Sequence, residues 1–344
     1  MLEIDGSKKS GSGTILRLSI ALAAITKQSL YLYNIRNNRK PSGLRPQHLE
    51  SVNVAAKLCN AETKGVKLDS RELWFKPNEI VKGKIIAEIG TAGSIPMLLL
   101  TVLPICAYSK GDINIHVING GTDVRYSPTI NYMKHVFLPL LERMGLKTSL
   151  IIKKFGYYPK GMGEVILNVT SKTVLKPITI EEFGSISKIN GISVCTFLEK
   201  QKVAERQADS AISVITKHGY KTNIQVVNDQ SNPIQKGSSL VLWSQTTKGA
   251  ILGADAIGER GKPSETVGKE AAKKLLKETE TKPTVDVHLA DMLIPYIALA
   301  KGSSSYLTRE ITEHIKTNIW LTEKILGSKI QVTKTGNKYR ITKN

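Results

Sequence analysis

One order of elements recurs three times along this chain, and the recurrence limits the folds open to it. Residues 1–85, residues 86–170 and the C-terminal segment each contain a glycine-rich turn, an apolar helix, a strand, a second helix and a hairpin. One unit alone cannot bury both faces of its helices, so the units must stack to make a core. We therefore expect an α/β fold (α+β in the broader sense), with a large domain of three βαβαββ-like repeats in a pseudo-threefold arrangement.

The spacing of apolar residues places the elements of these units. The expected helices are residues 15–26, 49–58, 95–107, 130–144, 290–300 and 308–326. Between the two helices of each unit we expect a strand, and these strands are residues 30–35, 113–118 and 303–307. Each unit then closes with a hairpin.

The third unit is interrupted. Its first strand is expected near 177–182, whereas its first helix begins only near Asp286. Between them lie further strand patterns and two helical patterns, at 204–218 and 264–278, and surface loops accept such inserted domains well. We therefore predict a large domain formed by residues 1–183 and 280–344, and a small inserted α/β domain formed by residues 184–279.

The formal net charge of +20 attracts polyanions, which makes nucleic acid the leading partner class and an anionic membrane surface the second. A lysine-rich surface that binds neither remains an alternative. No apolar run approaches the ~20 residues that span a bilayer, so we expect no membrane segment and a cytoplasmic protein. Cys59, Cys106 and Cys195 are scattered, which argues against a disulfide framework or a zinc site.

A basic loop follows the expected strand at 30–35. It places Arg36, Arg39, Lys40 and Arg45 within ten residues, with no acidic residue among them. Prolines and a glycine break regular structure here, so we expect a loop that opens a helix near 47–49. Guanidinium groups beside a helix N-terminus suit phosphate oxygens. A solvated basic loop without a ligand is the alternative.

Three glycine turns could contribute backbone amides to a shared anion site. They are Gly6–Thr14, Gly90–Ser94 and Gly120–Asp123. The first is not a P-loop, because Ser12 follows Gly11 where that motif requires lysine. A glycine turn before a helix is common, so each turn alone is a weak signal.

Two histidines are candidates for chemistry. His314 shares an expected helical face with apolar residues and with Asn318, which could hold one imidazole nitrogen and leave the other as a nucleophile. His288 is a second candidate, with Asp291 three residues later. A histidine on an apolar stripe is more often a core residue, and that alternative stays open. No evident metal cage accompanies either residue.

Nine motifs follow one another over nearly the whole chain: ILR (15–17), IRNNRKPSGLRPQHL (35–49), GTAGS (90–94), GGTDVRYSP (120–128), GYYPKGMGEV (156–165), VAERQ (203–207), GADAIGERGKP (253–263), HLADMLIP (288–295) and EHIKTNI (313–319). In this order they resemble the RNA 3′-terminal phosphate cyclase family, in its archaeal-type members. The resemblance implies a large domain similar to the C-terminal domain of bacterial translation initiation factor three, repeated three times, with a smaller inserted domain.

The resemblance also implies an activity: ATP-dependent conversion of an RNA 3′-phosphate into a 2′,3′-cyclic phosphodiester, a ligase-type reaction that releases AMP and pyrophosphate. It makes His314 the catalytic nucleophile that carries AMP, before the AMP passes to RNA. The implied nucleotide-binding residues are His288, Leu289, Ala290, Asp291, Met292 and Pro128. Those implied to bind the RNA terminal phosphate are Arg17, Arg36, Arg39 and Gln47. The implied cofactors are ATP and a divalent cation, Mg²⁺ or Mn²⁺, and a homodimer is left open.

Some residues depart from the family pattern. Where the family has E-G-G-G-Q before ILR, this chain has Ser10, Gly11, Ser12, Gly13 and Thr14. The missing glutamate is a metal-binding side chain in the family, so no metal ligand is assigned. Other departures are Leu100 and Met292 for glutamines, Asn131 for an aspartate and Met162 for a glycine.

Two alternative functions remain open at this point. One is the family's non-catalytic branch, whose members bind RNA and protein in ribosome assembly; the loss of glutamate at Ser10 favours it, and His314 argues against it. The other is a phosphate-binding transferase such as the enolpyruvyl transferases, which lack this insert and this histidine.

Overall fold

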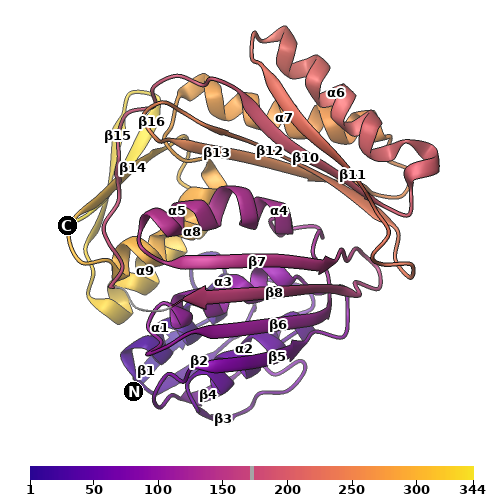
Figure 1. Cartoon of the computed structure of the whole chain (residues 1–344). Coiled ribbons are helices and arrows are strands. Elements are labelled where there is room, and N and C mark those ends of the chain that lie inside the picture. The colour runs from indigo at the N-terminus through magenta and orange to yellow at the C-terminus, as the bar shows by residue number, and fades with distance from the viewer. Residues whose placement is uncertain (171–173) are drawn as a thin grey trace.

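Each of the three units forms its own four-stranded sheet in the computed structural model, which describes residues 1–170 and 174–344. Within each sheet the first two strands of the unit pair in parallel, and the hairpin strands add antiparallel partners in the same order. The mixed α/β class is therefore confirmed (Figure 1). The pseudo-threefold placement of the sheets stays a prediction.

The elements follow the expected order. The first unit contains β1 (Leu2–Asp5), α1 (Gly13–Thr26), β2 (Leu30–Tyr33), α2 (Pro46–Leu58), β3 (Glu62–Lys64) and β4 (Leu73–Lys76). The second contains β5 (Gly83–Glu88), α3 (Ile95–Cys106), β6 (Ile113–Gly120), α4 (Ile130–Tyr132), a π-helical segment (Met133–Phe137), α5 (Leu138–Arg143), β7 (Lys147–Lys154) and β8 (Gly163–Thr170). The third contains β9 (Thr179–Ile180), α8 (Val287–Leu299), β14 (Ser304–Thr308), α9 (Glu313–Leu326), β15 (Ile330–Thr335) and β16 (Lys338–Lys343).

The first helix of each unit is largely buried, because most of its residues are apolar. These helices, α1, α3 and α8, lie in one large core cluster, and α9 packs on both α1 and α8. The contact between α1 and α9 joins the beginning of the chain to its end.

Between β9 and α8 the chain forms a fourth sheet. Its elements are β10 (Ile189–Thr196), a 3₁₀ turn (Glu199–Gln201), α6 (Val203–Lys217), β11 (Thr222–Asp229), β12 (Gly237–Gln245), β13 (Ile251–Ile257) and α7 (Ser264–Thr281). This sheet has a core cluster of its own with α6 and α7, and Figure 1 shows it above α4 and α5. The predicted domain boundaries themselves stay a prediction.

Two expected helices differ from those observed. The helix expected at 308–326 begins only at Glu313, because Thr308 ends β14 and Thr312 caps the helix. The helix expected at 130–144 contains the π-helical segment Met133–Phe137. All three cysteines are free and buried, and burial raises the pKa of each thiol.

Candidate active site

His314 lies in the first turn of α9. Thr312 Oγ1 accepts a hydrogen bond from Ile315 N at 3.0 Å and starts the helix there. The imidazole is partly buried, and its Nδ1 lies 3.1 Å from Thr14 Oγ1 at the start of α1. The contact between α1 and α9 thereby positions one ring nitrogen of His314.

Arg17 completes this arrangement, because its Nη2 donates to the same Thr14 hydroxyl at 3.3 Å. In the tautomer with the proton on Nδ1, Thr14 Oγ1 accepts from both His314 and Arg17. That tautomer leaves the lone pair of Nε2 free. The arrangement can therefore present Nε2 as a nucleophile.

The sequence hypothesis assigned the holding role to Asn318, and the structure corrects it. Asn318 Nδ2 donates to the backbone oxygen of Asp291 at 2.8 Å, so it ties α9 to α8. Thr14 holds the imidazole in its place. The available signal was the three-residue spacing of Thr14 and Arg17, which puts both on one face of α1.

The surroundings of His314 disfavour its protonated form. Burial lowers the pKa of the imidazole below its ordinary value of 6.5, and the charges of Arg17 and Arg39 lower it further. A neutral imidazole has a lone pair to donate, whereas an imidazolium has none. The surroundings of His314 thus favour its nucleophilic form.

The first glycine turn packs tightly between the basic loop and α9. Ser10 N donates to Thr317 Oγ1 of α9 at 3.2 Å, and Ser12 caps α1 by accepting from Thr14 N. A Cβ on Gly13 would come within 2.4 Å of His48 Nε2, so only glycine fits that position. The turn therefore brings the basic loop, α1 and α9 together.

The basic groups of this region have few acidic partners. No carboxylate pairs with Arg17, Arg36 or Arg39 within the part of the chain that the structure describes. Arg36 Nη1 instead donates to two carbonyls of its own loop, Pro41 O at 2.9 Å and Gly43 O at 2.8 Å. Burial and the charge of Arg36 lower the pKa of Arg17 to about 10. Clustered cations without acids favour an anionic ligand.

The other cationic residues of the basic loop lie on the outer side of that loop. Arg39 and Lys40 line a cavity of about 500 Å³ together with Arg71. The acid at this cavity, Asp69, pairs with Arg45, and both side chains are largely exposed. Arg39 therefore remains without a carboxylate partner at the rim of the site.

His48 is a functional candidate that the sequence analysis did not single out. It is 4% exposed, and its Nδ1 has no hydrogen-bond partner within residues 1–170 and 174–344. Burial lowers its pKa to about 2, and the charges of Arg17 and Arg36 lower it further. The signal available in the sequence was its position directly after Gln47 in a loop without acids.

Gln47 joins two of the predicted glycine turns to the basic loop. Its Oε1 accepts from Ser94 N at 2.6 Å, which places the Gly90–Ser94 turn beside α2. Gly121 N then donates to Gly93 O at 2.8 Å, so the third glycine turn follows directly. The structure thus links all three turns through neighbouring contacts, although Gln47 Oε1 is already engaged.

Residues 288–292, which the sequence predicts to bind the nucleotide, differ in their burial. His288, Asp291 and Met292 are exposed or partly exposed, whereas Leu289 and Ala290 are fully buried in the core. Their side chains therefore face away from any ligand. The Asp291 carboxylate accepts from Thr312 Oγ1, the cap of α9, so this segment lies directly beside the helix that carries His314.

Pro128 lies in the loop before α4, partly buried, and its carbonyl accepts from Ser127 Oγ at 3.0 Å. One turn later, Tyr132 Oη donates to both carboxylate oxygens of Asp286, at 2.7 and 2.8 Å. Asp286 also caps α8 just before His288. These bonds connect α4, which follows Pro128, to the residue directly before α8.

No cluster of three or more histidine, cysteine or acidic side chains suited to a metal occurs among residues 1–170 and 174–344. The described side chains therefore do not fit a dedicated metal cage. In the same residues, no helix combines the length and apolar character that a membrane crossing requires.

Comparison with known proteins identifies the family of this chain, which the geometry of the site alone does not. A family model described as RNA 3′-terminal phosphate cyclase matches residues 8–332. A protein named RNA 3′-terminal phosphate cyclase from Pyrobaculum aerophilum is 43% identical over 99% of this chain and 97% of its own length. Proteins of the same name from Methanosarcina barkeri (40% identical; 99% of both chains) and Pyrococcus furiosus (41%; 96% and 95%) agree. The chain belongs to the RNA 3′-terminal phosphate cyclase family.

Four residues that we expect to depart from the family pattern have defined contacts in the structure. Thr14 contacts His314. Ser10 Oγ lies 3.0 Å from Ser12 Oγ in the first glycine turn. Leu100 and Met292 are partly buried and pack against the large core.

Proposed function

We propose that this protein is an ATP-dependent RNA 3′-terminal phosphate cyclase whose nucleophile is His314. The observation that carries the proposal is the neutral, partly exposed imidazole held by Thr14 next to arginines without acidic partners. The names of its relatives support the same reaction. Site roles, ATP use and the covalent intermediate are parts of this proposal.

In the first step His314 Nε2 attacks the α-phosphorus of ATP. An N–P bond forms while the P–O bond to pyrophosphate breaks, and pyrophosphate leaves. Thr14 keeps the ring oriented through Nδ1. The nucleotide contacts that we retain are the exposed His288, the partly exposed Asp291 and Met292, and Pro128.

In the second step an oxygen of the RNA 3′-phosphate attacks the same phosphorus, and the N–P bond breaks to restore the imidazole. The terminal 2′-hydroxyl then attacks the activated 3′-phosphorus, loses its proton and displaces AMP. Arg17, Arg36 and Arg39 bind the acceptor phosphate in this scheme, because their positive charge stabilises the charge that develops on it. Gln47 contributes through its free amide nitrogen, since its oxygen is taken by Ser94.

A divalent cation, Mg²⁺ or Mn²⁺, is also part of the proposal. The described residues provide no three-ligand cage for it, and Mg²⁺ is commonly held by substrate phosphates and water. When bound, such an ion neutralises phosphate charge. Each step of the reaction relies on side chains of the protein itself.

As part of the same proposal, the protein acts in the cytoplasm, and ATP and RNA ends are its partners. Sedimentation would test whether it forms a homodimer.

Incubation with ATP labelled in its α-phosphate tests the proposal. We expect a protein-bound label that acid removes and base does not, since a phosphoramidate is acid-labile. Added RNA with a 3′-phosphate should discharge the label and yield a cyclic end. A native protein that binds RNA but never takes up label would instead belong with the non-catalytic members of the family.

A further inference from the structure

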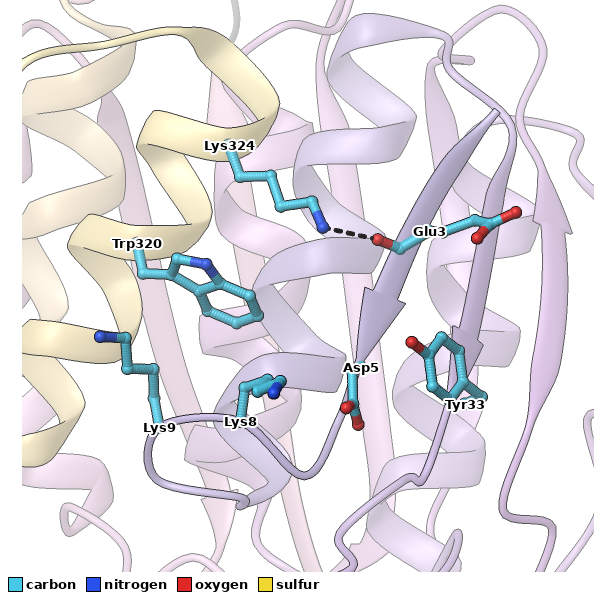
Figure 2. A pocket seen from close by; sticks show the side chains of 7 residues that line it. All are labelled: Glu3, Asp5, Lys8, Lys9, Tyr33, Trp320 and Lys324. Atoms are coloured by element: carbon cyan, nitrogen blue, oxygen red, sulfur yellow. Dashed lines mark hydrogen bonds between the residues drawn. The ribbon is translucent and has the colours of Figure 1, made fainter.

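A second cavity lies beside α9 that the proposed reaction does not use. Its volume is about 460 Å³, and it is bounded by the end of β1, the first glycine turn, β2 and α9. Figure 2 shows Trp320 and Lys324 of α9 on one side and Tyr33 on the other, with Lys8 and Lys9 below them. Two aromatic side chains and three cations thus face one open cavity.

The three lysines of this cavity share it with two acidic residues, Glu3 and Asp5, but form no close ion pair with them among the described residues. Lys324 Nζ donates to the backbone oxygen of Glu3 at 2.8 Å, and no ion pair of Lys8, Lys9 or Lys324 occurs in residues 1–170 and 174–344. Asp5 also lines the cavity, but its carboxylate accepts from Ser7 and from Asn34 Nδ2. The Glu3 carboxylate points away from Trp320 in Figure 2.

The aromatic surface continues beyond the cavity over the first sheet. Tyr33 and Tyr31 alternate with buried leucines on β2, so both rings lie on its outer face. Their centroids are 5.5 Å apart, and Trp74 of β4 stacks on Tyr31 at 4.5 Å. Trp74 is 37% exposed. Tyr31 and Tyr33 are partly exposed, and Tyr31 Oη donates to Glu72 Oε2 at 2.7 Å. Aromatic rings that are accessible in a row on a sheet are a surface on which single-stranded bases stack.

The cavity also lies next to the proposed reaction centre. Ser10, directly after Lys9, is bonded to Thr317 of α9, between His314 and Trp320. Six residues separate His314 from Trp320, which is ~9 Å along a helix axis. The ammonium of Lys324 lies 5.9 Å from the ring centroid of Trp320. Six residues also turn a helix by about 120°, so a strand that ends at His314 must pass around α9, over the Ser10–Thr317 contact, to reach this cavity.

We propose that this cavity and the Tyr33–Tyr31–Trp74 row bind the single-stranded RNA nucleotides that precede the terminal 3′-phosphate. Bases stack on Trp320 and Tyr33, and the lysines bind the intervening phosphates. This inference rests on the proposed function, because it assumes that RNA ends at His314. It adds a preference for longer substrates, which the terminal-phosphate contacts alone do not supply.

The test measures binding of RNA that carries a 3′-phosphate, without ATP, to native protein and to Trp320→Leu and Tyr33→Leu. Leucine keeps apolar contact with the core and removes the stacking surface. For a decanucleotide we expect the Kd to rise about 5- to 150-fold in each variant, the range given by one lost base stack. For a dinucleotide, too short to cover the surface, we expect little change. Tyr220→Leu, in the inserted sheet region, is the matched control.

Lys324→Gln tests the electrostatic part without removing a ring. Each lost phosphate contact should lower the slope of log Kd against log salt by about 0.7 for single strands. Lys273→Gln, an exposed lysine on α7, should leave that slope unchanged.

Self-adenylylation by ATP alone separates this inference from the proposed function. Trp320→Leu and Tyr33→Leu should retain it at the native rate. An unchanged decanucleotide Kd in both variants would overturn the RNA surface. A raised KM for ATP in place of a raised Kd for RNA would also overturn it, by assigning the cavity to the nucleotide. Absence of any adduct in the native protein would refute the proposed function, and the binding measurements would still decide the RNA surface.

Discussion

Two groups of arginines differ in their partners: some bind a carboxylate, and others bind none among the described residues. Arg206 of α6 donates through Nε and Nη2 to the two oxygens of Glu265, at 2.7 and 3.0 Å. Arg125 binds Glu259 in the same two-pronged manner and so ties the second unit to the insert. Each of these pairs raises the pKa of its arginine and lowers that of its glutamate.

Arg17, Arg36 and Arg39 lack such carboxylate partners across the described chain. Burial lowers the pKa of Arg17 to about 10, the opposite direction from Arg206. The charge of a paired arginine is already balanced by a carboxylate of the fold, whereas a cluster of unpaired arginines is stabilised by binding an anion. The difference is the one that the proposed function expects, in which Arg17, Arg36 and Arg39 bind an anion and the paired arginines stabilise the fold.

The largest expected effect is at the centre of the unpaired region. His314→Ala should abolish self-adenylylation, because it removes the partly exposed imidazole that Thr14 holds beside Arg17. The other imidazole near Arg17, that of His48, is only 4% exposed. The cost to folding should be on the order of 1–3 kcal/mol, since one partly buried side chain is lost. Labelled ATP measures the adduct, and urea unfolding measures stability.

His288→Ala is the control for this variant, because His288 is the other exposed histidine near the site. Covalent AMP retained by His314→Ala and lost in His288→Ala would move the nucleophile to His288.

As the pH falls, the two regions should lower the free energy of unfolding over different pH ranges. His48 in the unpaired region has a pKa of about 2 when folded, against an ordinary 6.5. Between these values the unfolded chain binds a proton that the folded one refuses, so His48 removes stability as pH falls below 6.5, by about 1.4 kcal/mol per pH unit. The glutamates of the paired arginines, whose pKa lies below 4.5, lose their contribution only at lower pH.

The measurement is the urea unfolding free energy at pH 7.0 and at about pH 5.5, for native protein and His48→Gln. The native loss should exceed that of the variant by about 1.4 kcal/mol. His218→Gln, at an exposed histidine that follows α6, should behave as native. Equal losses in native and His48→Gln proteins would show that His48 is not a buried neutral group.

The smallest expected effect comes from adding an acid to the unpaired region. Ser10→Glu should lower the metal concentration at half-maximal adenylylation severalfold, because a carboxylate binds a hard cation better than a hydroxyl does. Lys8 and Lys9 will offset part of the added charge. Thr216→Glu, at an exposed position of α6, controls for net charge. Superimposable metal titrations would leave the turn as a phosphate site only.

Sequence patterns located much of this arrangement. Pro46 and the prolines around it correctly place a loop that opens a helix, because proline fits the first helical turn. The repeat order follows from local periodicity, and it is confirmed in the three matching sheets. Element ends were less certain: Thr308 looked helical from its neighbours but pairs with β16.

Contacts between distant segments could not be read in the same way. Thr14 and His314 are 300 residues apart, and nothing local to either one signals their hydrogen bond. Asn318 had the right helical spacing to reach His314, but its partner is the backbone of α8, which only the packing of α8 on α9 reveals. The isolation of His48 depends on burial by three segments at once, and sequence spacing does not report burial.

The most direct test compares one arginine from each region. The measured quantity is the ratio of RNA affinities for a 3′-phosphate end over a 3′-hydroxyl end, in native protein, Arg39→Ala and Arg206→Ala. We expect Arg39→Ala to lower this ratio about 10- to 150-fold, the worth of a hydrogen bond to a charged group, while self-adenylylation stays near native. Arg206→Ala should keep the native ratio. An unchanged ratio in Arg39→Ala, or an equal fall in both variants, would contradict the assignment of the unpaired arginines to the RNA terminal phosphate.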